Sequence, residues 1–318
     1  METTEDVSEE MIVIESSNNN QEDQETKDDD KSVSSDDEYN ISKHDTLVLP
    51  GGGIKGLTIL GALQYCYDNF LLTDIVNYVG TSSGSMICYL LAIGYTPTDI
   101  ITNICCNQIM EKMQHFDLFA MINNLGATTF TSVYEVLEKL TIDKIGYLPT
   151  LMDIKQQYNK NLVFITYNLT KNMEECLSCE THPSLPCLVA LRMSSNLPLI
   201  FENYKYNNNL YIDGGITNNF AIDVGETIGT KVLGVYIHYV YSPTSNTTNN
   251  ILEYIYKLIY IPILEQQKNK LEKASREKCT IIDMSDTMVV KMFDFSISTT
   301  EKLELFSAGY RQVKEKKI

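Results

Sequence analysis

Residues 75–93 read IVNYVGTSSGSMICYLLAI: a short apolar run, a Gly-x-Ser-x-Gly turn and a longer apolar run. A strand-length apolar run, a glycine turn and a helix-length apolar segment are typical of a β-turn-α unit. A similar unit comes earlier, where the apolar run 46–49 is followed by Pro50, a glycine run and a helical pattern over residues 54–70. Repeated units of this kind predict an α/β fold in which helices cover parallel strands.

The Gly-x-Ser-x-Gly turn has the sequence of a nucleophile elbow. Ser82 is flanked by Gly80 and Gly84, and it lies between the predicted strand and the predicted helix. The glycines permit a tight turn that exposes the serine hydroxyl, and the N-terminus of the following helix favours negative charge beside it. We therefore predict that Ser82 is a nucleophile. The neighbouring Ser83 and Ser85 are interpreted as residues at the start of the helix.

The earlier glycine run, GGGIKG, admits two interpretations. It matches the Gly-x-Gly-x-x-Gly pattern of dinucleotide sites, which need an acidic residue at the end of the second strand. Asp74 precedes that strand instead, so the pattern favours a different use. We predict that the N–H groups of Gly51, Gly52 and Gly53 form an oxyanion hole. Gly56 ends the glycine run, and the helical pattern that begins at Ile54 places a helix N-terminus behind these N–H groups.

A third glycine turn supplies a carboxylate. Asp213 follows a short apolar strand and is followed by Gly214 and Gly215. A buried carboxylate at a strand end can accept the serine proton, because burial raises its pKa. His238, near the end of a later strand, would complete the Ser–Asp–His order of an α/β-hydrolase. The spacing does not fix a contact between His238 and Asp213, so a Ser–Asp pair and a triad both remain open.

Charge is concentrated at the start of the chain. Residues 1–45 contain 16 acidic and 3 basic residues, and the whole chain has a formal net charge of −17. Such a polar segment buries too little apolar surface to fold, so we predict a disordered acidic tail over residues 1–45. Residues 46–318 are predicted to form one globular domain. The absence of a basic patch argues against a nucleic-acid partner.

Eight cysteines in 318 residues do not make a disulfide scaffold and are typical of reduced thiols in an intracellular protein. No signal peptide is evident either. Cys176, Cys179, His182 and Cys187 have some features of a zinc site, but the spacing is tighter than in structural zinc fingers. We interpret them as unrelated loop residues and predict no metal.

Two longer segments have helical patterns. Residues 97–124 are predicted as helical, and residues 251–277 as a long helix with a break at Pro262. The apolar part of the second segment is too short and too interrupted to span a bilayer. Its first ten residues are apolar on most sides and could rest in a lipid interface, although a core helix covering the sheet is the favoured interpretation.

The three glycine motifs, in this order, resemble those of the patatin-like phospholipase family. GGGIKG resembles the family's oxyanion loop, GTSSG its nucleophile elbow and DGG its aspartate turn. Two further stretches are similar, ALRMSSNLP at residues 190–198 and the pair Asn218–Asn219. The likeness runs from about Thr46 to Asn219. Pro50 departs from the small polar residue that is common before the glycine run.

This resemblance implies a three-layer α/β/α fold with a mostly parallel central sheet. It implies a dyad of Ser82 and Asp213 that hydrolyses ester bonds of phospholipids or related acyl lipids, with no histidine, metal or cofactor. The expected partners are the acyl-lipid substrate and, transiently, a membrane surface. A lipid-binding or regulatory protein that keeps this fold without useful activity is the alternative from another class. The oligomeric state is left open.

Overall fold

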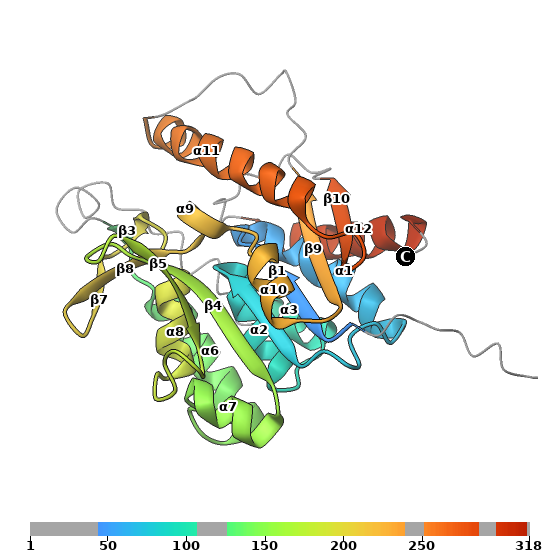
Figure 1. Cartoon of the computed structure of the whole chain (residues 1–318), viewed down its shortest axis with the longest axis horizontal. Helices are drawn as coiled ribbons and strands as arrows, with labels where there is room; N and C mark the ends of the chain where they lie inside the picture. Colours follow the sequence, from blue (N-terminus) through green and yellow to red (C-terminus); the bar gives the residue numbers. More distant parts are fainter. Residues whose placement is uncertain (1–43, 107–125, 239–250, 286–296, 317–318) are drawn as a thin grey trace, which may run out of the picture. The chain divides into compact units, whose positions relative to one another are not determined.

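Two of the predicted strands, Thr46–Leu49 (β1) and Asn77–Thr81 (β2), pair in parallel near the centre of an eight-stranded sheet. The computed structural model describes residues 44–106, 126–238, 251–285 and 297–316 (Figure 1). The strand order is β10-β9-β1-β2-β4-β8-β7, with β5 paired to β4. The parallel set is completed by β4 (Asn161–Asn168), β9 (Val232–His238) and β10 (Cys279–Ser285). The antiparallel strands are β5 (Met173–Ser178), β7 (Tyr204–Tyr206) and β8 (Asn209–Asp213).

Helices cover both faces of this sheet, as the β-turn-α pattern predicts (Figure 1). Alternation along β1 sends Leu47 and Leu49 into one apolar core and Val48 into the other. The larger core is formed with α1 (Gly56–Asp68), α2 (Ser83–Ala92), α3 (Pro97–Cys106), α6 (Thr131–Ile145), α7 (Leu151–Tyr158), α8 (Cys187–Ser194) and α12 (Thr299–Lys316). The smaller core is formed with α10 (Ile222–Ile228) and the end of α11 (Ile251–Lys273). The predicted three-layer α/β/α fold is therefore confirmed.

The first and last described helices, α1 and α12, pack together through two glycines. A Cβ atom added at Gly61 would lie 1.8 Å from the carbonyl oxygen of Phe306. One added at Gly309 would lie 1.9 Å from the carbonyl oxygen of Thr58. Only glycine permits the two backbones to approach this closely, so the end of the chain is held against the helix that follows the glycine loop.

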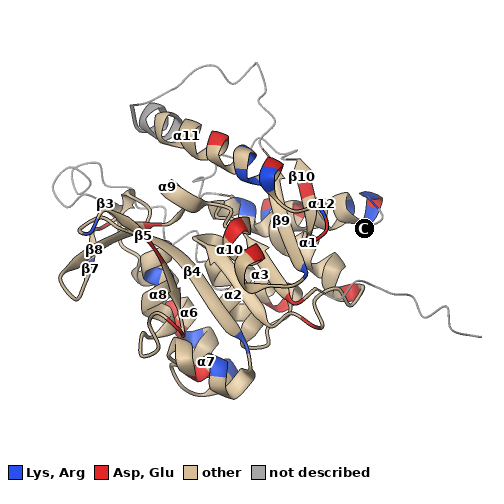
Figure 2. Ribbon diagram, in the orientation of Figure 1, with Lys and Arg blue, Asp and Glu red and all other residues tan. Residues whose placement is uncertain are grey.

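The long helix α11 differs from its prediction. It continues through Pro262, because the buried Ile263 and Gln267 anchor the residues that follow the proline. Among residues 258–273 of this helix, the charged side chains lie toward the C-terminal end (Figure 2). No helix within the described ranges is both long and apolar enough to cross a membrane.

Other predictions fall partly outside the described residues. The helix predicted over residues 97–124 is observed as α3, and residues 107–125 lie outside the description. Most of the predicted tail, residues 1–43, also lies outside it. Its last two residues are placed: His44 is buried, and Asp45 accepts hydrogen bonds from Thr230. The short strands β5 and β7 were not predicted, because β5 alternates weakly and β7 has only three residues.

Candidate active site

Ser82 occupies a sharp turn between β2 and α2. Its backbone angles, φ 53° and ψ −125°, match the first central position of a type II′ turn, which normally requires glycine. The flanking glycines allow the turn to close: a Cβ at Gly80 would lie 2.6 Å from Ser85 Cα, and one at Gly84 would lie 2.5 Å from Pro50 O. The strained serine, the flanking glycines and the helix behind it make up the geometry of a nucleophile elbow.

Hydrogen bonds hold this turn from both sides. The N–H of Ser82 donates to Ser194 Oγ at 3.2 Å, and Ser194 Oγ donates to Ile165 O at 2.6 Å. The carbonyl oxygen of Ser82 accepts a hydrogen bond from Ser85 Oγ at 2.6 Å. Ser85 thus lies in the first turn of the helix, as predicted, and it also fixes the elbow. Such over-determination is what allows a non-glycine residue to keep a strained conformation.

The register of β4 explains how Asp213 reaches this turn. Thr166 pairs with β5 on one edge and with Asp213 of β8 on the other. Ile165 pairs with β5 on one edge and with Thr81 of β2 on the other. Thr81 and Asp213 are therefore consecutive neighbours along a single edge of β4. Because Ser82 follows Thr81 directly, residues 131 positions apart in the chain meet at one point of the sheet.

The carboxylate of Asp213 is buried and incompletely paired. Its Oδ1 accepts the N–H of Gly215 at 2.7 Å, whereas Oδ2 has no partner of hydrogen-bond geometry among the residues that the structure describes. Burial raises the pKa of Asp213 to about 6, although the nearby Ser82 hydroxyl and the N–H of Gly215 act in the opposite direction. Gly214 allows the close approach to β4, since a Cβ there would lie 2.3 Å from Ile165 O. The result is a carboxylate suited to accept a proton near neutral pH.

The glycine loop lies directly against Ser82. A Cβ at Gly51 would lie 2.9 Å from the Cβ of Ser82. Gly51 also exchanges two hydrogen bonds with Asn219: its N–H donates to Asn219 O at 3.2 Å, and its carbonyl accepts from Asn219 Nδ2 at 3.0 Å. The N–H of Gly52 donates to Ser83 Oγ at 3.1 Å. Gly53 adopts a positive φ of 55°, and no acceptor for its N–H is found within the described residues.

Ser82, Asp213 and the glycine loop line one cavity of about 190 Å³. Gly56, at the start of α1, and Gly215 line it as well. Apart from these residues its wall is mostly apolar and comes mainly from α1, α2, α3, α6, α11 and the segment 195–201. A polar pair in the wall of a mostly apolar cavity suits a ligand with a reactive polar group and a hydrocarbon chain.

His238 lies elsewhere on the sheet edge. Its Nδ1 lies 2.7 Å from Asp283 Oδ1, and its Nε2 lies 3.3 Å from Ser285 Oγ. Both ring nitrogens therefore face β10, and the residue does not line the cavity that contains Ser82. The alternative in which His238 completes a triad with Asp213 has no support in this geometry.

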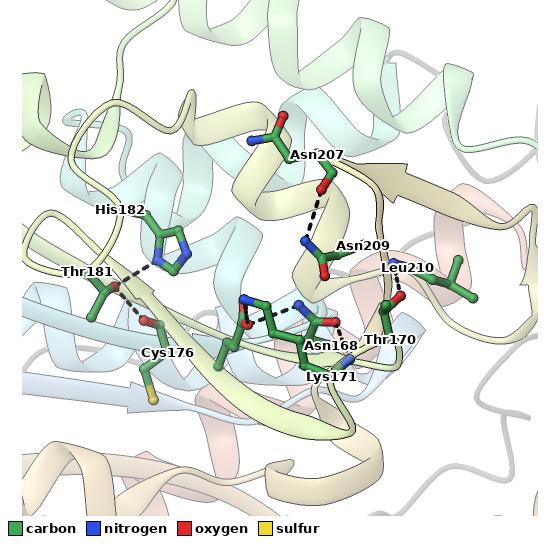
Figure 3. A network of polar contacts seen from close by, with 10 residues as sticks. Asn168, Thr170, Lys171, Cys176, Thr181, His182, Asn207, Asn209 and Leu210 are labelled. Atoms are coloured by element: carbon green, nitrogen blue, oxygen red, sulfur yellow. Dashed lines mark hydrogen bonds and ion pairs between the residues drawn. The ribbon is translucent and has the colours of Figure 1, made fainter.

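Cys176, Cys179, His182 and Cys187, which extend from β5 through the following loop to the start of α8, do not gather as metal ligands. His182 Nδ1 lies 3.0 Å from Thr181 Oγ1, which in turn donates to Cys176 O at 2.7 Å. Figure 3 shows the sulfur of Cys176 directed away from the imidazole ring. Within the described part of the chain, no three His, Cys, Asp or Glu side chains are grouped as a metal site.

Three supporting residues were not assigned a role from the sequence. Ser194 and Asn219 lie in the two stretches that resemble the family, which indicated where they are but not that they hold Ser82 and Gly51. Ser83 was interpreted only as a helix-start residue, whereas its hydroxyl accepts the Gly52 N–H. No local sequence signal marks these contacts, because each joins segments more than 30 residues apart.

The chain is similar in sequence to two viral proteins, and a solved bacterial structure aligns with it more weakly. A protein of Invertebrate iridescent virus 6, "Probable lipid hydrolase 463L", is 35% identical over 184 residues, which are 57% of this chain and 63% of that protein. "Uncharacterized protein R571" of Acanthamoeba polyphaga mimivirus is 25% identical over 295 residues, 90% of this chain and 97% of its own length. Among solved structures, VipD from Legionella pneumophila aligns with a TM-score of 0.49 and 17% identity, covering 86% of this chain and 66% of its own.

The match therefore spans slightly less than two thirds of the iridescent virus protein and of VipD. A family model described as patatin-like phospholipase matches residues 47–225. This range contains the glycine loop, the elbow, Asp213 and Asn219. Because it covers more than half of the chain, the protein belongs to the patatin-like phospholipase family.

Proposed function

We propose that this protein is a lipid acyl hydrolase that cleaves ester bonds of phospholipids or related acyl lipids with Ser82 and Asp213. One observation carries the proposal: a serine in a strained elbow and a buried carboxylate of raised pKa line the same apolar cavity. Family membership and the likeness to a viral protein named as a probable lipid hydrolase support the choice of substrate class.

The reaction would proceed through an acyl-enzyme. Ser82 Oγ attacks the ester carbonyl carbon while its proton passes to Asp213, and the carbon–oxygen bond to the alcohol then breaks. The departing alcohol takes the proton from Asp213. A water molecule next attacks the acyl-enzyme, giving up one proton to Asp213, and this proton returns to Ser82 as the fatty acid leaves. The two steps consume only the ester and water, and Ser82 and Asp213 return to their starting protonation states.

Negative charge on the carbonyl oxygen would be stabilised by the glycine loop. We assign this role to the N–H groups of Gly53 and Gly52, the latter after release from Ser83 Oγ. The N–H of Gly51 is engaged by Asn219 O, so Gly51 anchors the loop instead of serving as a third donor. The sequence predicted all three glycine N–H groups as donors. We propose two, because the N–H of Gly51 already donates to a backbone carbonyl.

The aliphatic cavity would hold the acyl chain. An acyl chain held between the apolar side chains of α2 and α6 would leave its ester group beside Ser82 and Asp213, which line the same cavity. Burial of the hydrocarbon contributes about 0.8 kcal/mol for each CH₂ group. The arrangement therefore favours long acyl chains over short ones.

Acyl release from mixed phospholipid vesicles, with chelator present, tests the proposal. Wild-type protein is expected to release fatty acid, and a fluorophosphonate is expected to label Ser82, because both reactions need the same activated hydroxyl. Peptide mapping of the labelled protein identifies the serine. Ser285→Ala is the matched control, since Ser285 lies beside the His238 imidazole, which in turn contacts the Asp283 carboxylate.

A lipid-binding protein without turnover predicts a different set of results. It would bind the vesicles, release no fatty acid above the level of Ser82→Ala and leave Ser82 unlabelled. Labelling of Ser285 in place of Ser82 would contradict the assignment of the nucleophile while leaving the enzyme class intact.

A further inference from the structure

The apolar part of α11 presents a row of exposed side chains. Leu258 is 50% exposed and Ile261 is 54% exposed, and Pro262 next to them is exposed as well. Residues at spacings of three and four lie on one face of a helix, so the three side chains form a continuous strip. Single exposed apolar residues are common on proteins, but a strip of three on one helix face marks a contact surface.

The same turns of α11 also form a wall of the cavity. Ile259, Tyr260 and Ile263 line the cavity that contains Ser82. Between residues 258 and 263 the helix is therefore apolar around its whole circumference, with one side toward the cavity and the other toward solvent. A helix of this kind is suited to an apolar environment on both sides.

The exposed face changes character immediately after Pro262. Glu265, Lys268 and Glu272 continue the same face toward the C-terminus, and all three are exposed. Figure 2 shows the charged residues of the described part of α11 gathered at this end. An apolar strip that ends at charged residues is suited to an apolar environment that the strip enters and the charged residues do not.

We propose that Leu258, Ile261 and Pro262 form the surface by which the protein enters a phospholipid bilayer, and that lipid passes from there into the cavity. The inference rests on the proposed function, because an acyl chain must leave a lipid surface before it reaches Ser82. A lipid surface is chosen over a protein partner because the strip is continuous with the wall of an apolar cavity. The charged border would remain in the headgroup region.

The experiment compares the double variant Leu258→Gln/Ile261→Gln with wild type, both as the full chain. Vesicles of phosphatidylcholine alone are used, so that net charge does not decide binding. Binding is measured by co-sedimentation in a Ser82→Ala background, and hydrolysis is measured on the same vesicles and on a soluble short-chain ester. We expect vesicle binding and vesicle hydrolysis to fall by about 10-fold or more, and hydrolysis of the soluble ester to stay within about twofold.

Leu303→Gln supplies the matched control. Leu303 is 47% exposed, but it lies on α12, against the opposite face of the sheet. This variant is expected to bind and hydrolyse vesicles as wild type does. Equal losses in Leu303→Gln and in the double variant would show a general effect of surface polarity and would overturn the proposal.

Three further outcomes would also overturn it. The double variant could keep vesicle binding, it could lose soluble-ester hydrolysis in parallel, or it could convert an oligomer to a monomer. The second result would make the strip part of the cavity structure, and the third would make it an interface between copies of the chain. If wild type hydrolyses no ester at all, the proposed function fails, and the binding measurement still tests the surface on its own.

Discussion

Two places on the sheet edge bring a serine and an aspartate together, and they differ in what surrounds them. At the ends of β9 and β10, His238 lies 2.7 Å from Asp283 and 3.3 Å from Ser285, which are the contacts of a Ser–His–Asp triad. At the end of β2, Ser82 lies beside Asp213, and no histidine of the described ranges lines their cavity. Yet Asp283 is 51% exposed and His238 is 41% exposed, whereas Asp213 is 2% exposed.

The difference shows that residue identity is a weaker guide to a site than environment. Burial raises the pKa of Asp213 to about 6, the elbow strains Ser82, and an apolar cavity opens beside both. The residues around Asp283 form an exposed polar contact, where water competes for each hydrogen bond. We expect catalysis at Ser82 and Asp213 and little at Ser285 and Asp283.

The largest expected effect comes from replacing Ser82 with alanine, and the same replacement at Ser285 is the comparison. Ser82→Ala should lower acyl release by on the order of 10³ or more, because the attacking oxygen is lost. Ser285→Ala should leave the rate within about twofold. Both variants are measured with the same vesicles, and equal losses would mean that the exposed triad-like contact takes part in catalysis.

Asp213→Asn should lower the rate by about 10²- to 10³-fold, since the amide cannot accept the serine proton. It should also change stability in a predictable direction. An acid with a pKa raised from 3.8 to about 6 stabilises the fold below pH 4 and loses that contribution, about 3 kcal/mol, as pH rises through 6. The variant should therefore unfold at higher denaturant than wild type at pH 8, with no such gain at pH 3.5. Asp283→Asn is the exposed control.

The sequence alone predicted those residues of the candidate site that lie in short local motifs. Each glycine turn marks one strand end, so the positions of Ser82, Asp213 and the glycine loop at strand ends could be predicted from the sequence alone. Their contacts could not, because the meeting of Ser82 and Asp213 depends on how β2 and β8 share one edge of β4. The antiparallel β8 breaks the β-turn-α pattern and therefore gives no periodic signal of its partner.

The same limit explains the helix prediction that failed. A proline within a helical pattern normally indicates a break, and a break was predicted at Pro262. The buried Ile263 and Gln267 tie the following turns to the domain, so tertiary packing outweighs the local cost. The glycine loop shows the reverse case. Its glycines were identified, but the commitment of the Gly51 N–H to Asn219 is a long-range contact that no spacing reveals.

The pH dependence of wild type sharpens the comparison. Asp213 must be unprotonated to act as a base, and its pKa is raised to about 6. The value of kcat/KM should therefore be level above pH 7 and fall about 10-fold for each pH unit well below 6. A profile measured on a soluble ester avoids changes in vesicle charge. A flat profile down to pH 4.5 would show that Asp213 is not the base.

Ser83→Ala tests the contact that holds the glycine loop. The Gly52 N–H loses its acceptor, and the loop loses part of its fixed position beside Ser82. We expect kcat to fall roughly 5-fold with KM unchanged, because the donors act on the transition state more than on the bound ester. Ser83→Thr keeps the hydroxyl and should restore most of the rate. A rise in kcat would instead mean that releasing the Gly52 N–H from Ser83 Oγ slows the reaction more than the fixed loop position speeds it.

The smallest expected effect is the one that decides between the two places most directly. His238→Ala removes both contacts to β10 and should change kcat by less than about twofold, since Asp213 needs no imidazole to accept the serine proton. Its acid limb should remain near pH 6, where the buried carboxylate titrates. A loss of stability without a loss of kcat would assign His238 to the pairing of β9 with β10. A large fall in kcat together with a displaced acid limb would mean that both places take part in one catalytic site. The exposed carboxylate of Asp283 would then have to act on Ser82 through His238.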